Sequence, residues 1–458
     1  MKIIILGAGR VGASVAENLV SEQNDITVVD VDATPLMLLQ EHLDLRVVVG
    51  SGTHITTLQA AGADDADMLI ACTTSDEVNL VACKIARQIF NVPQRIARIR
   101  SNEFVDQPEL IADGFGIDHL ISPERSVTTY LERLIEFPEA LQVVDFAQGQ
   151  VMLVLAKIAP GSAMANLSVA ELGERLPEAP VQVLAIFRND RPITLEPQTR
   201  LQLDDEVFFL VESRQAHKAM RALRRTETAT HRIMIAGGGN IGARLARELA
   251  RQGYSVKLIE HNARRCEQLS TTLPDKVMVL HGDATDESLL EDENVEGADV
   301  FLAITNDDEN NIMSALLAKR MGARRVMSLI SRRSYGELME GSRIDVAVAP
   351  DQTTIGELLR YVRRGDVVAV HRLRRGGTEA IEAIAHGDPS SSRVVGRRIS
   401  QLQLPSGASI GAVVRGETIL MPQADPVIES EDHVIVLVTR RRLIPKVERL
   451  FQVSASFF

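Results

Sequence analysis

The sequence repeats itself at an offset of about 230 residues. Residues 3–12 read IIILGAGRVG and residues 233–242 read IMIAGGGNIG, so that three glycines recur in the same order. Residues 66–79 (ADMLIACTTSDEVN) match residues 298–311 (ADVFLAITNDDENN), and residues 205–211 (DEVFFLV) match residues 432–438 (DHVIVLV). These matches are collinear across half of the 458 residues. The chain is therefore predicted to be a tandem duplication, which has to fold as two copies of one unit.

Each half changes character once along its length. The first part alternates short β-branched runs with amphipathic stretches, which indicates a parallel sheet covered by helices on both faces. The second part contains strand-like runs such as VMLVLA and VFFLV with few helical stretches, which indicates a small α+β domain. We predict an α/β protein in which a Rossmann-like doubly wound parallel-sheet domain is followed by a small α+β domain, twice. The predicted domains are residues 1–123, 139–225, 231–350 and 366–453, with a polar linker at 226–231.

Composition narrows the possible functions. The formal net charge of −12, the lack of Trp and the 3% aromatic content argue against nucleic acid as a partner. The three cysteines have no CxxC spacing, which argues against a disulfide framework or a zinc site. Apolar runs such as Val207–Val211 are far shorter than the roughly 18 residues that a membrane span needs. The chain opens on a strand-like KIII without a signal peptide, so we expect a cytoplasmic protein.

Both glycine loops have the sequence pattern of a nucleotide-binding turn. Each follows an apolar strand and opens a helix, so its glycines permit a tight turn, a close approach of phosphates and helix–strand packing. The N-terminus of the helix offers unpaired N–H groups and a positive dipole end to those phosphates. The predicted binding residues are Gly7, Ala8, Gly9, Arg10, Val11 and Gly12 in the first copy and Gly237, Gly238, Gly239, Asn240, Ile241 and Gly242 in the second.

An acidic residue follows the second strand of each copy. Asp30 lies 23 residues after Gly7, and Glu260 lies at the same interval after Gly237. A carboxylate at this position accepts hydrogen bonds from ribose hydroxyls and repels a 2′-phosphate. We therefore expect NAD-type or plain adenine nucleotides rather than NADP.

Further polar residues end the next strands, where side chains border the ligand crevice of a doubly wound sheet. Thr73 and Thr74 take this place in the first copy, and Thr305 and Asn306 take it in the second. An alternative, which could hold together with the first, is that these residues cap the helices that begin at Asp76 and Asp308.

Arg98 in the run RIARIR could reach a ligand phosphate, or it could form a surface ion pair. At the offset of 230 its counterpart is Ser328, which carries no charge. A polyphosphate such as ATP should therefore favour the first cleft.

This order of domains, with runs such as ILGAGRVG, DITVVD, RIMIAGGGNIGARLA and ITNDDENNIMSALLAKRMGA, resembles the RCK (regulator of K⁺ conductance) family over the whole chain. Within that family it is similar to the peripheral nucleotide-binding subunits of bacterial Trk-type potassium uptake systems. The resemblance implies that NAD(H) and also ATP or ADP bind in the clefts, at the glycine loops, Asp30, Thr73, Thr74, Arg98 and Glu260. The motif Gly282-Asp283-Ala284-Thr285 implies an adenosine contact by Asp283, whereas the first copy has Ser51 at that place.

The resemblance also implies a regulatory role rather than catalysis. Such subunits form a homo-oligomeric ring, here expected to contain four chains, at the cytoplasmic face of the inner membrane beneath a membrane-embedded potassium-translocating subunit. The helices after Pro123 and Pro350 are candidates for hinges or inter-domain packing elements, or are ordinary core helices. An NAD-dependent oxidoreductase with duplicated cofactor domains is the alternative. The sequence has no HExxH or GxSxG motif, and the small domains have no matched histidines for acid–base catalysis.

Overall fold

The computed structural model describes residues 1–20, 24–175, 180–189, 191–223, 230–339, 341–362, 366–373 and 378–453. Most of the predicted linker at 226–231 lies outside these residues. The chain divides into two compact units, the first made of Met1–Ser126 and Pro350–Leu358, and the second of Val127–Ala349 and Leu359–Phe458. Within the described ranges, no helix has the length and apolar character needed to cross a membrane.

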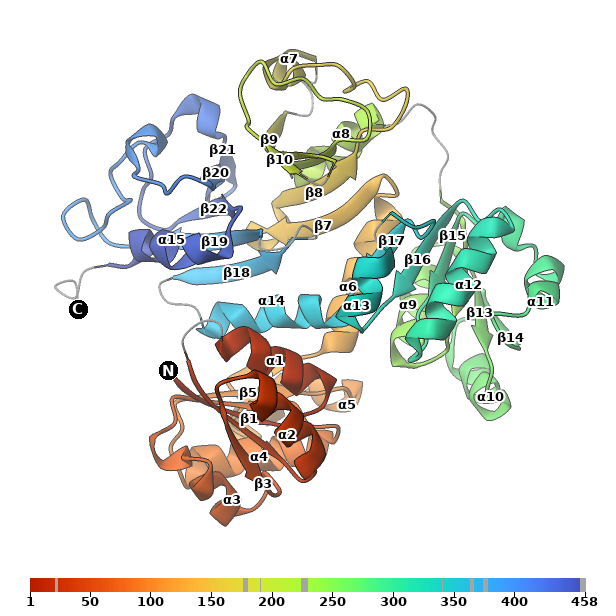
Figure 1. The fold of residues 1–458 in the computed structure, drawn as a ribbon, viewed down its shortest axis with the longest axis vertical. Helices are drawn as coiled ribbons and strands as arrows, with labels where there is room; N and C mark the ends of the chain where they lie inside the picture. The colour runs from red at the N-terminus through yellow and green to blue at the C-terminus, as the bar shows by residue number, and fades with distance from the viewer. Residues whose placement is uncertain are drawn as a thin grey trace. The chain divides into compact units, whose positions relative to one another are not determined.

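The first domain is a six-stranded parallel sheet in the order β3-β2-β1-β4-β5-β6 (Figure 1). Its central strands are buried on both faces because their residues are apolar without alternation. The strands are β1 (Lys2–Leu6), β2 (Asp25–Asp30), β3 (Arg46–Val49), β4 (Met68–Ala71), β5 (Gln94–Arg98) and β6 (His119–Ile121). The helices are α1 (Arg10–Val20), α2 (Ala33–His42), α3 (Ile55–Ala60), α4 (Asp76–Gln88) and α5 (Asn102–Val105).

The third domain repeats this sheet in the order β14-β13-β12-β15-β16-β17, which is the same topology strand by strand. Its strands are β12 (Arg232–Ala236), β13 (Ser255–Glu260), β14 (Val277–His281), β15 (Val300–Ala303), β16 (Arg325–Leu329) and β17 (Val346–Val348). Its helices are α9 (Asn240–Arg251), α10 (Ala263–Thr272), α11 (Glu287–Asp292), α12 (Asp308–Arg320) and α13 (Arg333–Met339).

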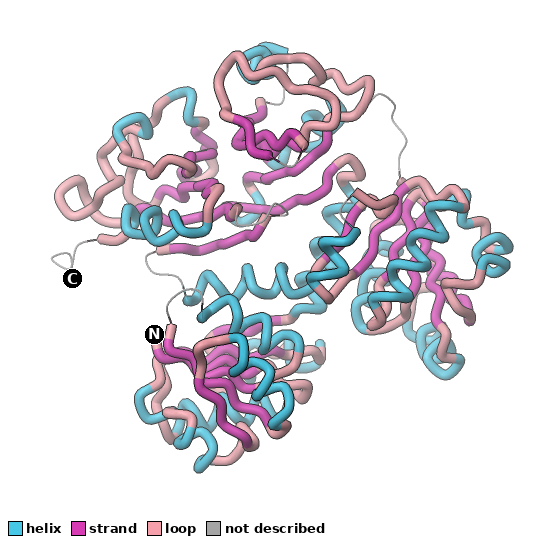
Figure 2. Tube along the Cα trace, in the orientation of Figure 1, coloured by secondary structure: helices cyan, strands magenta, loops and turns pink. Residues whose placement is uncertain are grey.

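The two small domains are antiparallel five-stranded sheets, whose strands are drawn in magenta in Figure 2. The first, in the order β10-β9-β11-β8-β7, contains β7 (Ala140–Phe146), β8 (Val151–Lys157), β9 (Val181–Arg188), β10 (Arg191–Ile193), β11 (Glu206–Glu212), α7 (Val169–Arg175) and α8 (Ala216–Leu223). The second, in the order β18-β19-β22-β20-β21, contains β18 (Val367–Arg372), β19 (Glu379–Ala385), β20 (Ala408–Arg415), β21 (Thr418–Leu420), β22 (Asp432–Val438) and α15 (Ile444–Phe451). The predicted fold class is therefore confirmed.

The small domains pack against each other inside the second unit. One buried cluster joins Phe146, Phe208 and Leu210 of the first small domain to Ile435 and Leu437 of the second. The approach is close at Gly411 on β20, since a Cβ atom there would lie 2.3 Å from Cδ1 of Leu210. The duplication thus brings its two small domains together as a pseudo-dimer within one chain.

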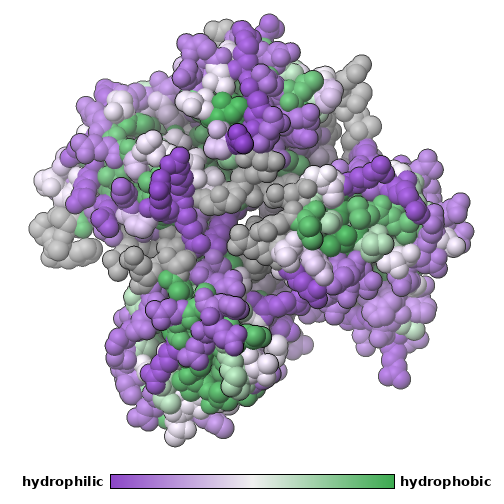
Figure 3. Space-filling view, viewed as in Figure 1, coloured by the Kyte–Doolittle hydropathy of each residue, from purple (hydrophilic) through white to green (hydrophobic). Residues whose placement is uncertain are grey.

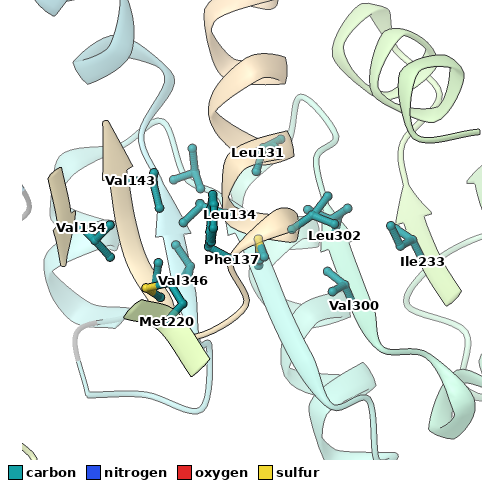
Figure 4. Packing of buried hydrophobic residues seen from close by; sticks show 14 of the residues in the cluster. Leu131, Leu134, Phe137, Val143, Val154, Met220, Ile233, Val300, Leu302 and Val346 are labelled. Atoms are coloured by element: carbon teal, nitrogen blue, oxygen red, sulfur yellow. The ribbon is translucent and has the colours of Figure 1, made fainter. Parts of the chain in front are cut away.

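One helix follows the last strand of each Rossmann-like domain. These are α6 (Pro123–Glu136) and α14 (Pro350–Val362). From Val127 onward, α6 belongs to the second unit, where Leu131, Leu134 and Phe137 join a core that also contains Val143 of β7 and Leu302 of β15 (Figure 4). Of the two interpretations, inter-domain packing therefore describes α6: it connects the first small domain to the second Rossmann-like sheet.

Exposed apolar side chains lie at matched positions on α4 and α12. Val81 is 42% exposed on α4, and Met313, at the equivalent position of α12, is 60% exposed. Ile85 and Leu317 lie one turn further along these helices and are partly buried. Figure 3 shows the hydrophobic area over the second Rossmann-like domain where α12 lies. The exposed apolar position is thus common to both copies of the fold.

Candidate functional site

The first glycine loop has the geometry that its spacing predicts. Gly7 has a φ of +102°, in the left-handed region that glycine tolerates best. A Cβ atom on Gly12 would lie 1.8 Å from the carbonyl oxygen of Gly7, so this position has no room for a larger residue. Gly9 is different, because no described heavy atom beyond its chain neighbours lies within 4 Å of a Cβ built there.

The second loop reproduces each of these features. Gly237 has a φ of +111°, and a Cβ atom on Gly242 would lie 1.9 Å from the carbonyl oxygen of Gly237. Gly239 again faces open space as far as the described residues extend. The fold itself therefore requires the first and third glycines, whereas the middle glycine leaves the backbone open to a ligand. Arg10 and Asn240 follow as the exposed first residues of α1 and α9.

The two predicted ribose carboxylates also support the loops beside them. The Oδ2 atom of Asp30 accepts the backbone N–H of Ala8 at 2.6 Å, and its Oδ1 atom accepts that of Asp32 at 3.0 Å. Glu260 accepts the N–H groups of Gly238 at 2.9 Å and Asn262 at 2.8 Å. A carboxylate offers about four lone-pair sites, so both groups retain capacity for ribose hydroxyls.

A buried asparagine connects the strand ends that border the first crevice. Asn79 accepts hydrogen bonds from the backbone N–H of Thr73 at 3.0 Å and from its hydroxyl at 2.8 Å. The side-chain amide of Asn79 donates to the carbonyl oxygen of Arg98 at 2.8 Å, which ties β4 to β5. Our sequence analysis missed this residue, although the same asparagine ends both matched segments 66–79 and 298–311.

Asn311 repeats the arrangement in the second copy. It accepts the N–H and the hydroxyl of Thr305 at 2.8 and 2.7 Å, and it donates to the carbonyl oxygen of Leu329 at 2.9 Å. The interpretation of these threonines as helix caps is wrong. The N-caps of α4 and α12 are Ser75 and Asp307, whose side chains accept the N–H groups of Val78 and Asn310. Thr74 is exposed.

Arg98, the last residue of β5, forms an ion pair that is mostly buried rather than on the surface. Its guanidinium donates to Glu124 at 2.9 Å, and the two side chains are 13% and 16% exposed. Burial raises the pKa of the Cys72 thiol to about 12, while Arg98 lowers this pKa and Asp30 raises it. Cys72 directly follows β4, so Arg98 and Asp30 both act electrostatically on the crevice end of the sheet.

The strand registers correct the predicted counterpart of Arg98. In the first sheet Ala71 of β4 is paired with Ala97, and in the second Ala303 of β15 is paired with Ser328. The next residue on each strand is Arg98 in one copy and Leu329 in the other, so Ser328 is not the counterpart. The reason is that the second copy has two more residues before β15 and one fewer between β15 and β16, so the offset at β16 is 231 rather than 230. The expected loss of the positive charge in the second copy is confirmed.

The second cleft has polar groups of its own. Asp283 accepts the N–H and the hydroxyl of Thr285, both at 2.8 Å, and these bonds lower the pKa of its carboxyl group. In the first copy, Ser51 and Thr53 replace this turn with a hydroxyl–hydroxyl contact of 2.8 Å. Arg265 donates through Nε to the carbonyl oxygen of Gly238 at 3.0 Å.

The sequence analysis also missed Arg265. The sequence did contain a signal, namely a difference between the copies: the residue equivalent to Arg265 in the first copy is Pro35, which has no charge. In the described ranges, no cluster of three or more His, Cys, Asp or Glu side chains is arranged to hold a metal ion.

Comparison with known proteins shows which domains, chains and folds this protein is similar to. The TrkA-N domain model matches residues 3–123 and 233–350, and the TrkA-C domain model matches residues 153–224 and 388–452. The chain is 52% identical over 459 residues to the Trk system potassium uptake protein TrkA of Halomonas elongata and 51% identical to that of Vibrio alginolyticus, with complete coverage of both chains in each case. Its fold is similar to that of the GsuK channel bound to NAD, with a TM-score of 0.62 and 18% identity over 98% of this chain and 78% of that one.

Proposed function

The chain belongs to the family of Trk system potassium uptake proteins built from TrkA-N and TrkA-C domains, and from this membership we propose that it is a nucleotide-binding regulatory subunit of a potassium uptake system. The observation that carries the proposal is the open space at Gly9 and Gly239, since no contact within the described chain explains a glycine at either position. A dinucleotide pyrophosphate needs this close approach to the backbone.

NAD(H) is the proposed ligand of both clefts. The glycine loops and the N-termini of α1 and α9 would hold its phosphates, and Asp30 and Glu260 would accept its ribose hydroxyls. When bound, the nicotinamide nucleotide supplies a redox-sensitive signal. ATP and ADP are proposed for the first cleft, because Arg10 and Arg98 add positive charge there, whereas Asn240 and Leu329 occupy the corresponding positions of the second.

The proposed partner is a membrane-embedded Trk-type potassium-translocating subunit. The protein would bind it from the cytoplasmic face of the inner membrane and control its conductance without catalysing a reaction. Nucleotides can drive such control only through different affinities for two conformations. The proposed assembly is a homo-oligomeric ring of four chains, and the exposed apolar positions on α4 and α12 support association between chains.

Calorimetric titration of the purified chain with NAD⁺, NADH, ATP and ADP tests the proposal. Asp30→Ala should weaken nucleotide binding at the first cleft by at least tenfold, which is about 1.4 kcal/mol. Arg98→Ala should weaken ATP binding more than NAD⁺ binding. Unchanged isotherms for Asp30→Ala would show that the ribose assignment is wrong.

The alternative, an NAD-dependent oxidoreductase, predicts a different result. Sustained NADH oxidation with any member of a metabolite panel, at turnover typical of enzymes, would contradict a purely regulatory role. A deletion strain lacking other potassium uptake routes provides the cellular test, because its growth at low external potassium should require this gene.

A further inference from the structure

We propose that the last helix of the second small domain carries a docking site for an anionic lipid surface, formed by Arg440, Arg442, Lys446 and Arg449. The site acts by charge alone and needs neither a bound nucleotide nor a potassium-translocating partner. The inference therefore goes beyond the proposed function, because it adds a direct contact with lipid to the contact with a membrane protein.

Basic residues are concentrated at the end of the second small domain. Five of the ten residues 440–449 are Arg or Lys, although acidic residues outnumber basic ones by 62 to 50 in the whole chain. The one acidic residue of this segment, Glu448, is buried, with 7% exposure. The segment therefore presents a positive surface on a protein whose formal net charge is −12.

The local structure separates these charges from the apolar face of α15, which packs against β19 (Figure 1). The side chains that face the core are at most 2% exposed and are Ile444, Val447 and Phe451. Lys446 and Arg449 are exposed on the helix, and Arg442 is exposed in the single 3₁₀ turn Arg441–Leu443 that precedes it. Spacings of four and three residues bring such side chains together on one face of a helical segment.

This arrangement has a cost that a purely structural role does not explain. Like charges three or four residues apart on a helix repel each other and destabilise it. Within the described part of the chain, Arg440, Arg442, Lys446 and Arg449 form no ion pair with an acidic side chain that would relieve the repulsion. An anionic surface placed against this face would relieve it.

The duplication repeats the pattern in a weaker form. Each of the three basic positions from Arg442 to Arg449 has a basic counterpart 228 residues earlier, at the same place relative to α8, and these are Arg214, Lys218 and Arg221. The N-cap of the preceding 3₁₀ turn differs, since it is Glu212 in the first copy and Arg440 in the second. The positive charge is therefore larger in the second copy, and the site is assigned there.

The chemistry of this surface favours lipid headgroups over a protein or a nucleic acid. The structure describes all of residues 440–453, and no large apolar side chain among them is strongly exposed. The apolar and aromatic anchors of protein interfaces are therefore missing, and so are rings on which nucleic-acid bases could stack. Clusters of Lys and Arg bind the phosphates of an anionic leaflet without such anchors.

The acidity of the rest of the chain does not prevent this contact. In about 0.1 M salt the Debye length is about 10 Å, so charges further from the lipid are largely screened. The basic side chains closest to the headgroups then determine the interaction. For the same reason the binding should weaken strongly as the salt concentration rises.

Sedimentation of the purified full-length chain with lipid vesicles tests the site. Binding to vesicles of phosphatidylcholine mixed with phosphatidylglycerol should exceed binding to phosphatidylcholine alone at least tenfold, and it should be lost between about 0.1 M and about 1 M salt. The variant Arg442→Gln/Lys446→Gln/Arg449→Gln should bind the mixed vesicles at least tenfold more weakly. Its unfolding temperature should not fall, because all three side chains are exposed.

The matched control is Arg251→Gln/Arg320→Gln/Arg332→Gln. It removes the same charge from the same unit, but each of these exposed arginines is already paired with a glutamate. Binding to the mixed vesicles should change by less than about twofold. Equal losses in the two triple variants would show that net charge rather than this site governs binding, and would overturn the assignment.

Other outcomes would overturn the inference directly. These are equal binding of the wild-type chain to both kinds of vesicle, and tighter binding to a DNA duplex than to the mixed vesicles. A larger loss from Arg214→Gln/Lys218→Gln/Arg221→Gln than from the α15 variant would move the site to the first small domain and contradict its assignment to α15.

Failure of this inference and failure of the proposed function are distinguishable, because the vesicle assay contains no nucleotide. The α15 variant should bind NAD⁺ and ATP as the wild type does in calorimetric titration, so a loss of lipid binding alone supports a separate site. A wild-type chain that binds the mixed vesicles but no nucleotide would overturn the proposed function and leave the lipid site standing.

Discussion

At the scale of single residues, the glycine loops contain two kinds of glycine that a sequence motif does not distinguish. Gly7 and Gly12 are required by the fold, one for its positive φ and the other for its contact with the Gly7 carbonyl oxygen. Gly9 is required only if a ligand approaches it. The difference gives an experiment in which two substitutions in the same loop affect different properties, one nucleotide binding and the other stability.

Gly9→Ala should leave the free energy of unfolding within about 0.5 kcal/mol of wild type, because the new methyl group meets no atom of the described chain. It should nevertheless weaken nucleotide binding at least tenfold, because the methyl group occupies the approach of the phosphates. Gly12→Ala should lower the free energy of unfolding by about 2 kcal/mol or more, through a clash with Gly7. Urea unfolding and calorimetry on both variants measure this contrast, and equal destabilisation would contradict it.

His371 on β18 gives a prediction about pH. Its ring packs edge-on against Phe146 at 4.9 Å, and burial lowers its pKa to about 4, against an opposing hydrogen bond with the backbone of Asp145. The unfolded chain binds this proton near pH 6.5 and the folded chain near pH 4, so stability is full above pH 6.5 and falls as the pH drops between these values.

Allowing for solvent screening, the loss between pH 7 and pH 5 should be about 1–2 kcal/mol. Urea unfolding of His371→Gln, which cannot take up the proton, should show a correspondingly weaker pH dependence over this range. The same slope in both proteins would show that other groups cause it.

At the scale of elements, α6 is held at its C-terminal end by one arginine from a distant strand. Arg325 of β16 is buried and donates to the carbonyl oxygens of Leu134 at 2.7 Å and Ala140 at 2.5 Å. Burial lowers the pKa of Arg325 to about 10, so it stays charged at neutral pH. By strand register, Gln94 of the first copy occupies the position equivalent to Arg325, so the first copy has no arginine that could make this contact.

Arg325→Met should lower the free energy of unfolding by about 2–4 kcal/mol, because it leaves the carbonyl oxygens at the end of α6 without their charged donor. Arg324→Met is the control: that side chain is 39% exposed and lies 3.4 Å from Asp299, so its loss should cost less than about 1 kcal/mol. Equal losses in chemical denaturation would show that the buried contact has no special weight.

At the scale of the whole molecule, the duplication is not two independent halves. The second unit contains most of α6 from the first half, and the first unit contains residues 350–358 from the second half. The small domains share one core. The halves are thereby joined covalently and through exchanged segments, while α4 and α12 leave apolar surface exposed.

The double variant Val81→Glu/Met313→Glu should shift the protein from its oligomer to smaller species, because charges at exposed apolar contacts oppose association. Light scattering after size-exclusion chromatography measures the mass. Leu203→Glu, at a 52% exposed position of the first small domain, is the control and should leave the mass unchanged. An unaltered mass for the double variant would move the assembly surface elsewhere.

The amino-acid sequence determined the duplication, the fold class and the positions of the glycine loops and their acidic partners. These follow from local signals, since glycine spacing, unbroken apolar strands and helical periodicity are all contained within short segments. The strand ends carrying Thr73 and Thr305 were found for the same reason, because the end of a strand can be located from its neighbours.

Tertiary structure alone decided which distant side chains meet. Length differences in the connecting segments, two residues before β15 and one after it, moved the counterpart of Arg98 from Ser328 to Leu329. Three kinds of contact join residues from different elements. They are the ion pair of Arg98 with Glu124, the asparagine hydrogen bonds between strand ends, and the hydrogen bonds from Arg325 to carbonyl oxygens at the end of α6. Such contacts depend on register, loop length and the reach of long side chains, and these quantities are fixed only when the whole chain packs.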